Sequence, residues 1–156
     1  MSKAWPTYPF FPFYTTGLLH DTFGHLFRRC HLRSQQAFTR VFGGYGVTPL
    51  QYGILELVSR NPGITHRELA EAMVTAPSVV TTAMKALHRD GLLDLTPLSG
   101  DARHRHYRLS KAGENLFVLV QERIFDAEEL LVGPLTPAER RSLKRLLRRL
   151  AESERL

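Results

Sequence analysis

Polar and basic side chains recur at helical spacing near the middle of this 156-residue chain. They are Ser78, Thr81, Thr82, Lys85 and Arg89. Residues three and four positions apart share a helix face, and no acidic residue interrupts this run before Asp90. Hydroxyl groups and flexible cations contact base edges and phosphates when a helix lies in the major groove of DNA. The pattern indicates a DNA-contacting helix, although on its own it also fits a solvated face.

A second basic group, Arg103 to Arg105, lies near the tip of a predicted hairpin. Leu93 and Leu95 alternate with polar residues as in a strand, Pro97 to Gly100 is predicted to turn the chain, and residues 106–109 alternate back. A basic hairpin directly after a helix-turn-helix is a winged helix, whose tip can reach phosphates or the minor groove. We expect Arg103 and Arg105 to contact DNA there.

Asp101 lies two residues before Arg103 on the same predicted turn. Its carboxylate is close enough to hold the conformation of the tip and to orient a nearby guanidinium. We therefore expect Asp101 to organise the wing rather than to contact DNA.

The seven histidines and the hydroxyl residues give little indication of a metal site or a catalytic site. His104 and His106 would share one side of a strand, but zinc sites normally use three or four protein ligands. No glycine-rich phosphate loop occurs, and no nucleophile has a suggestive partner. We expect no metal, no cofactor and no enzyme activity.

Cys30 is the only cysteine, so the chain cannot form an intramolecular disulfide. Arg29 and His31 flank it and could stabilise a reactive thiolate. Because Cys30 is in helical register with Phe23 and Phe27, the favoured interpretation is a buried core residue. A peroxide-sensing cysteine is the alternative.

The elements that must position the candidate DNA contacts have clear boundaries. Thr65 and Glu68 form a capping box that begins one helix, and Pro77 suits the first turn of the next. In that second helix an apolar stripe must face a core, namely Val80, Ala83, Met84 and Leu87. Further helices are predicted over residues 18–42, from Thr48 to Asn61, 110–132 and from Thr136 onward.

The terminal helices carry apolar stripes that a single winged helix cannot cover. The last one has a leucine seam of Leu143, Leu146, Leu147 and Leu150. Such free stripes imply a partner, and the commonest arrangement is a two-fold dimer. Among the cations of the first helix, we expect Arg28 and Arg33 to be solvated and Arg29 and His31 to bind an anion.

Composition agrees with a basic, globular DNA-binding protein. The chain has a formal charge of +6, a pI near 9.9 and 43% hydrophobic residues, which suggests a polyanionic partner. Residues 1–17 are an aromatic and proline-rich arm without the pattern of a signal peptide. No apolar run is long enough to span a bilayer, so we expect a cytoplasmic protein without a membrane partner.

The order of elements, the GLL sequence at 91–93, the Asp101-Ala102-Arg103 tip and the run from Leu109 to Gly113 resemble the MarR family of transcriptional regulators. The resemblance implies a mainly α fold, a winged helix-turn-helix with long terminal helices forming an intertwined dimer interface. It divides the chain into the arm at 1–17, a dimerisation region at 18–46 and 110–156, and a DNA-binding lobe at 47–109. Thr82, Asp94 and Leu95 depart from the basic residues of many members.

The same resemblance implies a homodimeric transcriptional regulator that binds a near-palindromic site in double-stranded DNA, with Arg103 in the minor groove. It further implies a repressor released by a small aromatic acid or its CoA thioester, held between the first, second and fifth helices. Candidate effector-binding residues are Arg29, His31 and Tyr52. A non-specific, nucleoid-type DNA binder and a protein-interaction module with a degenerate winged helix are the alternatives from other classes.

Overall fold

The computed structural model describes residues 17–98 and 101–153, with side chains described for 18–95 and 107–153. The predicted arm therefore lies outside the described residues apart from Gly17. The elements are a 3-10 turn η1 (Gly17–Asp21), α1 (Phe23–Phe42), a 3-10 turn η2 (Gly43–Tyr45), α2 (Pro49–Arg60), α3 (His66–Ala72), α4 (Pro77–Arg89), β1 (Leu93–Leu98), β2 (Asp101–Leu109), α5 (Lys111–Val132) and α6 (Pro137–Ala151). The predicted fold class, mainly helical with a winged helix, is confirmed.

Two compact units divide the chain, Met1–Leu32 and Arg33–Leu156. In the first, α1 begins at Phe23 rather than at the predicted Leu18, because residues 17–21 form the tighter turn η1. The hydroxyl of Thr22 donates to the carbonyl of Leu19 at 2.9 Å, and the carbonyl of Thr22 accepts the first α-helical bond from Leu26 at 3.0 Å. The local bonds of Thr22 thus separate the 3-10 turn from the helix.

The predicted burial of Cys30 is wrong in the single chain, where this cysteine is exposed. The stripe to which it belongs is exposed as well, with Phe23 at 79% and Phe27 at 43%. Helical register correctly groups these residues on one face. It does not determine whether anything in the same chain covers that face.

Three helices begin at the capping boxes that the sequence predicts. The hydroxyls of Thr48, Thr65 and Thr136 each accept the amide N–H three residues on, and the side chain there accepts the N–H of the threonine. Ser110 caps α5 by accepting the N–H of Gly113 at 3.0 Å. These bonds satisfy donors that the first helical turn leaves unpaired, so each predicted start is confirmed.

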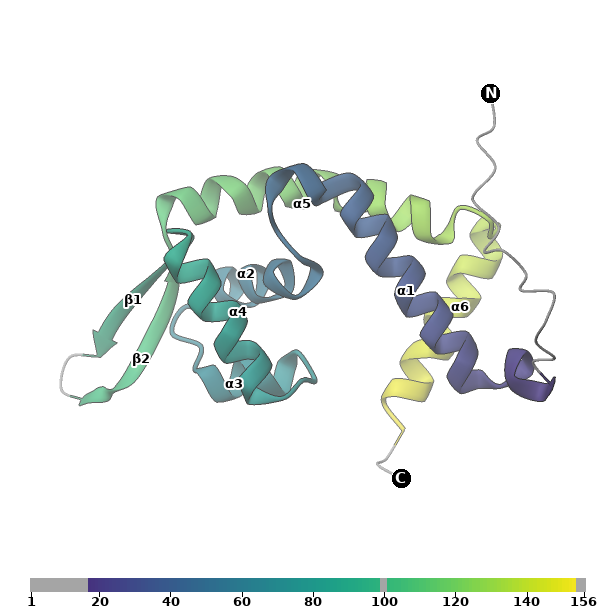
Figure 1. The fold of residues 1–156 in the computed structure, drawn as a ribbon, viewed down its shortest axis with the longest axis horizontal. Coiled ribbons are helices and arrows are strands. Elements are labelled where there is room, and N and C mark those ends of the chain that lie inside the picture. The colour runs from purple at the N-terminus through teal and green to yellow at the C-terminus, as the bar shows by residue number, and fades with distance from the viewer. Residues whose placement is uncertain (1–16, 99–100, 154–156) are drawn as a thin grey trace. The chain divides into compact units, whose positions relative to one another are not determined.

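The core of the larger unit joins the end of α1 to α2, α3, α4, β1 and α5 (Figure 1). Its fully buried side chains are Phe42, Ile54, Leu55, Leu69, Val80, Leu87, Leu93 and Val120. All four apolar positions predicted for α4 are buried. The buried stripe fixes the rotation of α4 about its axis and so determines which side chains it exposes.

Arg33, expected to be solvated, is half-buried and connects α1 to the end of α5. Its Nε donates to the carbonyl of Leu131 at 2.9 Å, and its Nη2 donates to the carbonyl of Leu130 at 3.0 Å. The last carbonyls of a helix lack partners within it and carry partial negative charge, so a guanidinium stabilises them. The prediction for Arg33 was wrong because its partners lie almost a hundred residues away in sequence.

The hairpin is antiparallel, with Leu93 opposite Leu109 and Pro97 opposite Arg105. Both strands are longer than predicted, since Pro97 lies inside β1 and not in the turn. Each strand of a two-stranded sheet has one unpaired edge, where the missing N–H of proline is tolerated. An irregular step follows Pro97, and the next pair is Leu98 with Asp101.

Candidate nucleic-acid interface

Helix α4 has one buried face and one polar exposed face. Val80 and Leu87 are 0% exposed and Met84 is 3% exposed. Four of the predicted contact residues are exposed on this helix, namely Ser78, Thr82, Lys85 and Arg89. The helix therefore presents two hydroxyls and two cations on the side away from its core contacts.

The turn between α3 and α4 sets the angle at which α4 leaves the core. Val74 in this turn has φ +48° and is 91% exposed, an unusual backbone conformation for a β-branched residue. The N–H of Thr75 then bonds the carbonyl of Ala70 at 3.2 Å, and Pro77 opens α4. The predicted helix-turn-helix is present.

Thr81 differs from the other predicted contact residues because its hydroxyl contacts a side chain of another helix. Its Oγ1 donates to the carbonyl of Pro77 at 2.8 Å and lies 2.9 Å from Nε2 of His66. This contact ties α3 to α4. The sequence analysis did not single out His66, and only its place in the first turn of α3 could have suggested the contact. DNA contact by Thr81 stays a prediction.

Arg89 lies at the end of α4 and is held by its neighbour. Its Nε donates to Asp90 Oδ1 at 2.9 Å, and this hydrogen bond raises the pKa of the guanidinium. Gly91 follows with φ +71°, a left-handed conformation that suits glycine and ends the helix. In the protein without DNA, Arg89 is therefore paired with Asp90. A phosphate that contacts Arg89 must share the guanidinium with this carboxylate.

A hollow of about 460 Å³ separates the start of α2 from the exposed side of α4. It is lined by Thr48, Leu50, Gln51, Ser78, Val79, Thr82, Ala83 and Ala86. Ser78 and Thr82 therefore face a groove whose opposite wall is the first turn of α2. The sequence analysis identified the cap at Thr48 but not its position beside α4.

The wing residues Asp101, Arg103 and Arg105 belong to β2 by their backbone, and their side chains lie outside the described residues. The base of the wing is described in detail. Ser110 Oγ donates to the carbonyl of Gly91 at 2.5 Å, and the Ser110 N–H donates to the carbonyl of Leu92 at 3.1 Å. Both ends of the hairpin are thereby attached to each other and to the start of α5.

The predicted effector residues are distributed over both compact units. Arg29 and His31 belong to Met1–Leu32 and are exposed, whereas Tyr52 belongs to Arg33–Leu156. The ring of Tyr52 stacks on Phe117 with centroids 6.3 Å apart and lies 6.0 Å from the ring of Phe38. Burial, and then the Glu56 carboxylate, raise the pKa of Tyr52. An effector site formed by the three residues stays a prediction.

Residues 17–98 and 101–153 contain no group of three or more histidine, cysteine, aspartate or glutamate side chains placed to hold a metal ion. Across that same part of the chain, no helix has the length and apolar character needed to cross a membrane.

Comparisons with known proteins agree with this geometry. The sequence model described as MarR family matches residues 45–104. A proposed transcriptional regulatory protein for the hcr operon of Thauera aromatica is 27% identical over 135 residues, covering 86% of this chain and 81% of that protein. The Thauera aromatica protein and a second sequence relative both carry the names of transcriptional regulators.

Solved structures show the same fold. The transcriptional repressor CouR bound to a 23-mer DNA duplex superimposes with a TM-score of 0.80 at 24% identity, covering 89% of this chain and 99% of CouR. BpsR of Bordetella bronchiseptica, whose DNA binding is regulated by 6-hydroxynicotinic acid, gives 0.77 at 22% identity, with coverage of 83% and 98%. Residues 45–104 thus match the MarR family of transcriptional regulators, and the described fold is the winged helix-turn-helix fold of these solved structures.

Proposed function

We propose that this protein is a homodimeric transcriptional repressor that binds a near-palindromic DNA site and is released by a small aromatic acid or its CoA thioester. The observation that carries the proposal is that α4 is buried on one side and exposed on the other. The Val80 side buries in the core, and the side with Lys85 and Arg89 stays exposed. A helix held in this way can enter a major groove, and the wing beside it can reach the minor groove.

Selection of bound fragments from genomic DNA would identify the site, and fluorescence anisotropy across a salt series would measure its affinity. Lys85→Ala should weaken binding and lower the slope of log K against log salt by about 0.9 for each lost phosphate contact. Lys111→Ala is the matched control because Lys111 is also an exposed lysine, at the start of α5. Equal losses in both variants would show that general charge, and not α4, determines the affinity.

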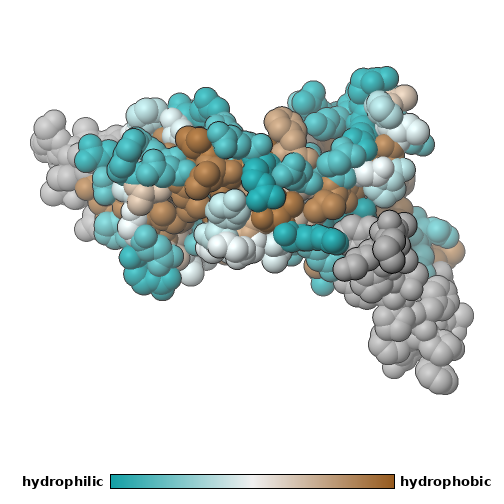
Figure 2. Space-filling model, turned by 90° about the horizontal axis from the view of Figure 1, so that it is seen from above, coloured by the Kyte–Doolittle hydropathy of each residue, from teal (hydrophilic) through white to brown (hydrophobic). Residues whose placement is uncertain are grey.

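The dimer is proposed from apolar residues left uncovered in the single chain. The seam of α6 is exposed, with Leu146 at 52% and Leu150 at 55%. Helix α5 also exposes hydrophobic residues, including Val118 at 50% and Phe125 at 74%. The view of the molecule from above shows hydrophobic residues exposed among hydrophilic ones (Figure 2). Burying such surface against a second copy would remove it from water, and two-fold symmetry would present two α4 helices to successive major grooves.

The effector class is proposed from the aromatic surroundings of Tyr52. The Phe38, Tyr52 and Phe117 rings offer a planar acid a surface for stacking. Arg29 and His31 are the cations proposed to bind a carboxylate. The test is the concentration of benzoate or benzoyl-CoA that releases half of the bound DNA. Arg29→Gln should raise that concentration and leave DNA affinity unchanged, whereas Arg28→Gln, the adjacent exposed arginine, should change neither. An unchanged concentration in Arg29→Gln would exclude this anion site.

The exposed thiol supports a second candidate, a peroxide-sensing regulator. Cys30 is accessible in the single chain and lies between Arg29 and His31. Cys30→Ser separates the two candidates, since an aromatic-acid repressor should keep its DNA binding and effector response in that variant. Peroxide-induced release that disappears in Cys30→Ser would favour the redox function.

A further inference from the structure

A second basic surface lies on α6, outside the candidate nucleic-acid interface. It consists of Arg141, Lys144, Arg145, Arg148 and Arg149, which we call the α6 stripe. These residues recur at i, i+3, i+4, i+7 and i+8, so they follow one side of the helix. All five are exposed, and the ion pairs among the described residues include none of them. In contrast, Arg140 on the same helix pairs with Glu129.

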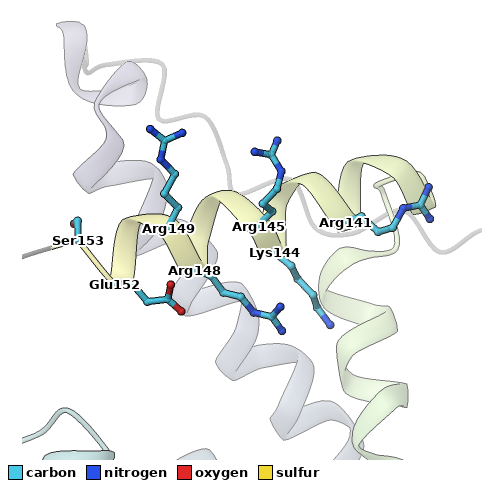
Figure 3. Close-up of a pocket in the computed structure, with 7 residues that line it drawn as sticks. All are labelled: Arg141, Lys144, Arg145, Arg148, Arg149, Glu152 and Ser153. Carbon is cyan, nitrogen blue, oxygen red and sulfur yellow. The ribbon is translucent and has the colours of Figure 1, made fainter.

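The α6 stripe is hollowed along its length. Figure 3 shows Arg145 and Arg149 pointing to one side of the helix and Lys144 and Arg148 pointing to the other. The space between the two rows is a shallow hollow of about 800 Å³, with Glu152 as its only acidic lining residue. A channel with cations on both sides has the charge and shape to hold an extended chain of phosphates.

The α6 stripe and the leucine seam occupy opposite sides of the helix. Each leucine of the seam, at 143, 146, 147 and 150, follows a cation of the stripe by two residues. Two residues correspond to a rotation of about 200° about the helix axis at 3.6 residues per turn. If the seam forms the proposed dimer contact, the cations remain exposed to solvent. The inference below rests on that part of the proposed function.

The α6 stripe is also distant from the wing, because helix α5 separates the two. Helix α5 joins the base of the wing at Lys111 and leads to α6 beyond Val132 (Figure 1). Its 22 residues span roughly 33 Å at 1.5 Å per residue. The α6 stripe and the wing therefore face different regions of space, and one short stretch of DNA cannot readily occupy both.

From these observations we infer that the α6 stripe is a second, sequence-independent DNA-binding surface, through which one dimer holds a duplex separate from the one bound by α4 and the wing. Each strand of duplex DNA carries about one charge per 3.4 Å. The five cations lie within about 12 Å of helix length, about one per 3 Å, so the two charge densities are similar. The flexible cations contact phosphates without reading bases, which makes the contact independent of sequence.

Capture of a second duplex on an immobilised one tests the inference. The full-length protein is bound to a biotinylated 40-base-pair duplex that contains the site selected from genomic DNA, and a fluorescent duplex of unrelated sequence is then added. Binding to the first duplex tests the proposed function, and capture of the second tests the α6 stripe. The wild-type protein should capture the second duplex, with capture weakening steeply as salt increases.

Two triple variants identify the surface. Replacing Arg145, Arg148 and Arg149 by glutamine should reduce capture at least fivefold and lower its salt slope by about 2 to 3, whereas replacing all three by lysine should preserve capture. Circular dichroism and sedimentation verify that both variants remain folded and dimeric.

Three outcomes would overturn the inference. They are failure of the wild-type protein to capture a second duplex, undiminished capture by the glutamine variant, and binding of the α6 stripe to phosphatidylserine vesicles in place of DNA.

Discussion

Replacing Gly113 by alanine tests how the wing is attached to α5. A Cβ at position 113 would lie 3.0 Å from the carbonyl carbon of Leu92 and 3.4 Å from its Cα, with the carbonyl oxygen closer still. These are backbone atoms at the base of the wing, so no side-chain rotation relieves the overlap. Either α5 must move away from β1, or the chain at Leu92 must shift.

The magnitude follows from the contacts at this joint. Overpacking against backbone costs about 1 to 3 kcal/mol, and the bonds from Ser110 to Gly91 and Leu92 would each lose about 1 kcal/mol. Alanine recovers about 1 kcal/mol because it favours the helix more than glycine does. We expect Gly113→Ala to lower the free energy of unfolding by about 2 to 4 kcal/mol.

Urea denaturation followed by circular dichroism measures this change. Gly24→Ala is the control, because Gly24 is also helical and a Cβ there would meet no atom within 4 Å. The control should be neutral or slightly stabilising. If Gly113→Ala unfolds within about 0.5 kcal/mol of the wild-type protein, the close approach of α5 to Leu92 is not a constraint in solution.

Leu146→Glu should dissociate the dimer, because burying a carboxylate in an apolar seam costs several kcal/mol, and an intact dimer on sedimentation would exclude α6 from the interface. Val74→Asn should raise the free energy of unfolding by about 0.5 to 1 kcal/mol in urea denaturation, since Asn tolerates positive φ and the exposed valine loses no packing. Arg103→Ala should weaken DNA binding by about 1 to 3 kcal/mol and lower its salt slope. Asp101→Ala should also weaken it, although it removes a negative charge, and tighter binding would contradict an organised wing.

Features set by neighbouring residues were predictable from the sequence. The capping boxes at Thr48, Thr65 and Thr136 involve residues only three positions apart, so their hydrogen bonds form wherever a helix begins. The buried positions of α4 follow from helical periodicity in the same way. Because the exposed face is the complement of the buried one, the same periodicity places Ser78, Thr82, Lys85 and Arg89 on the exposed side.

Features that depend on distant parts of the chain were not predictable. Arg33 was expected in solvent because its partners, the carbonyls of Leu130 and Leu131, belong to a helix that periodicity cannot place beside it. Cys30 was expected in the core because helical register shows which residues share a face, but not whether other residues cover that face. For the same reason Thr81 shares the spacing of the contact residues, yet its hydroxyl bonds inside the lobe.

The joint at Ser110 shows how a local signal acquires a long-range meaning. As a cap, Ser110 needs only the N–H of Gly113, and asparagine or aspartate would serve equally well. Its hydroxyl also donates to Gly91, and a side chain at Gly113 would collide with Leu92, so both residues are constrained by the opposite end of the hairpin. Serine and glycine three residues apart therefore do more than start α5. They attach that helix to the end of α4 and to the wing, so a displacement of α5 acts on the DNA-contacting elements through short, direct contacts.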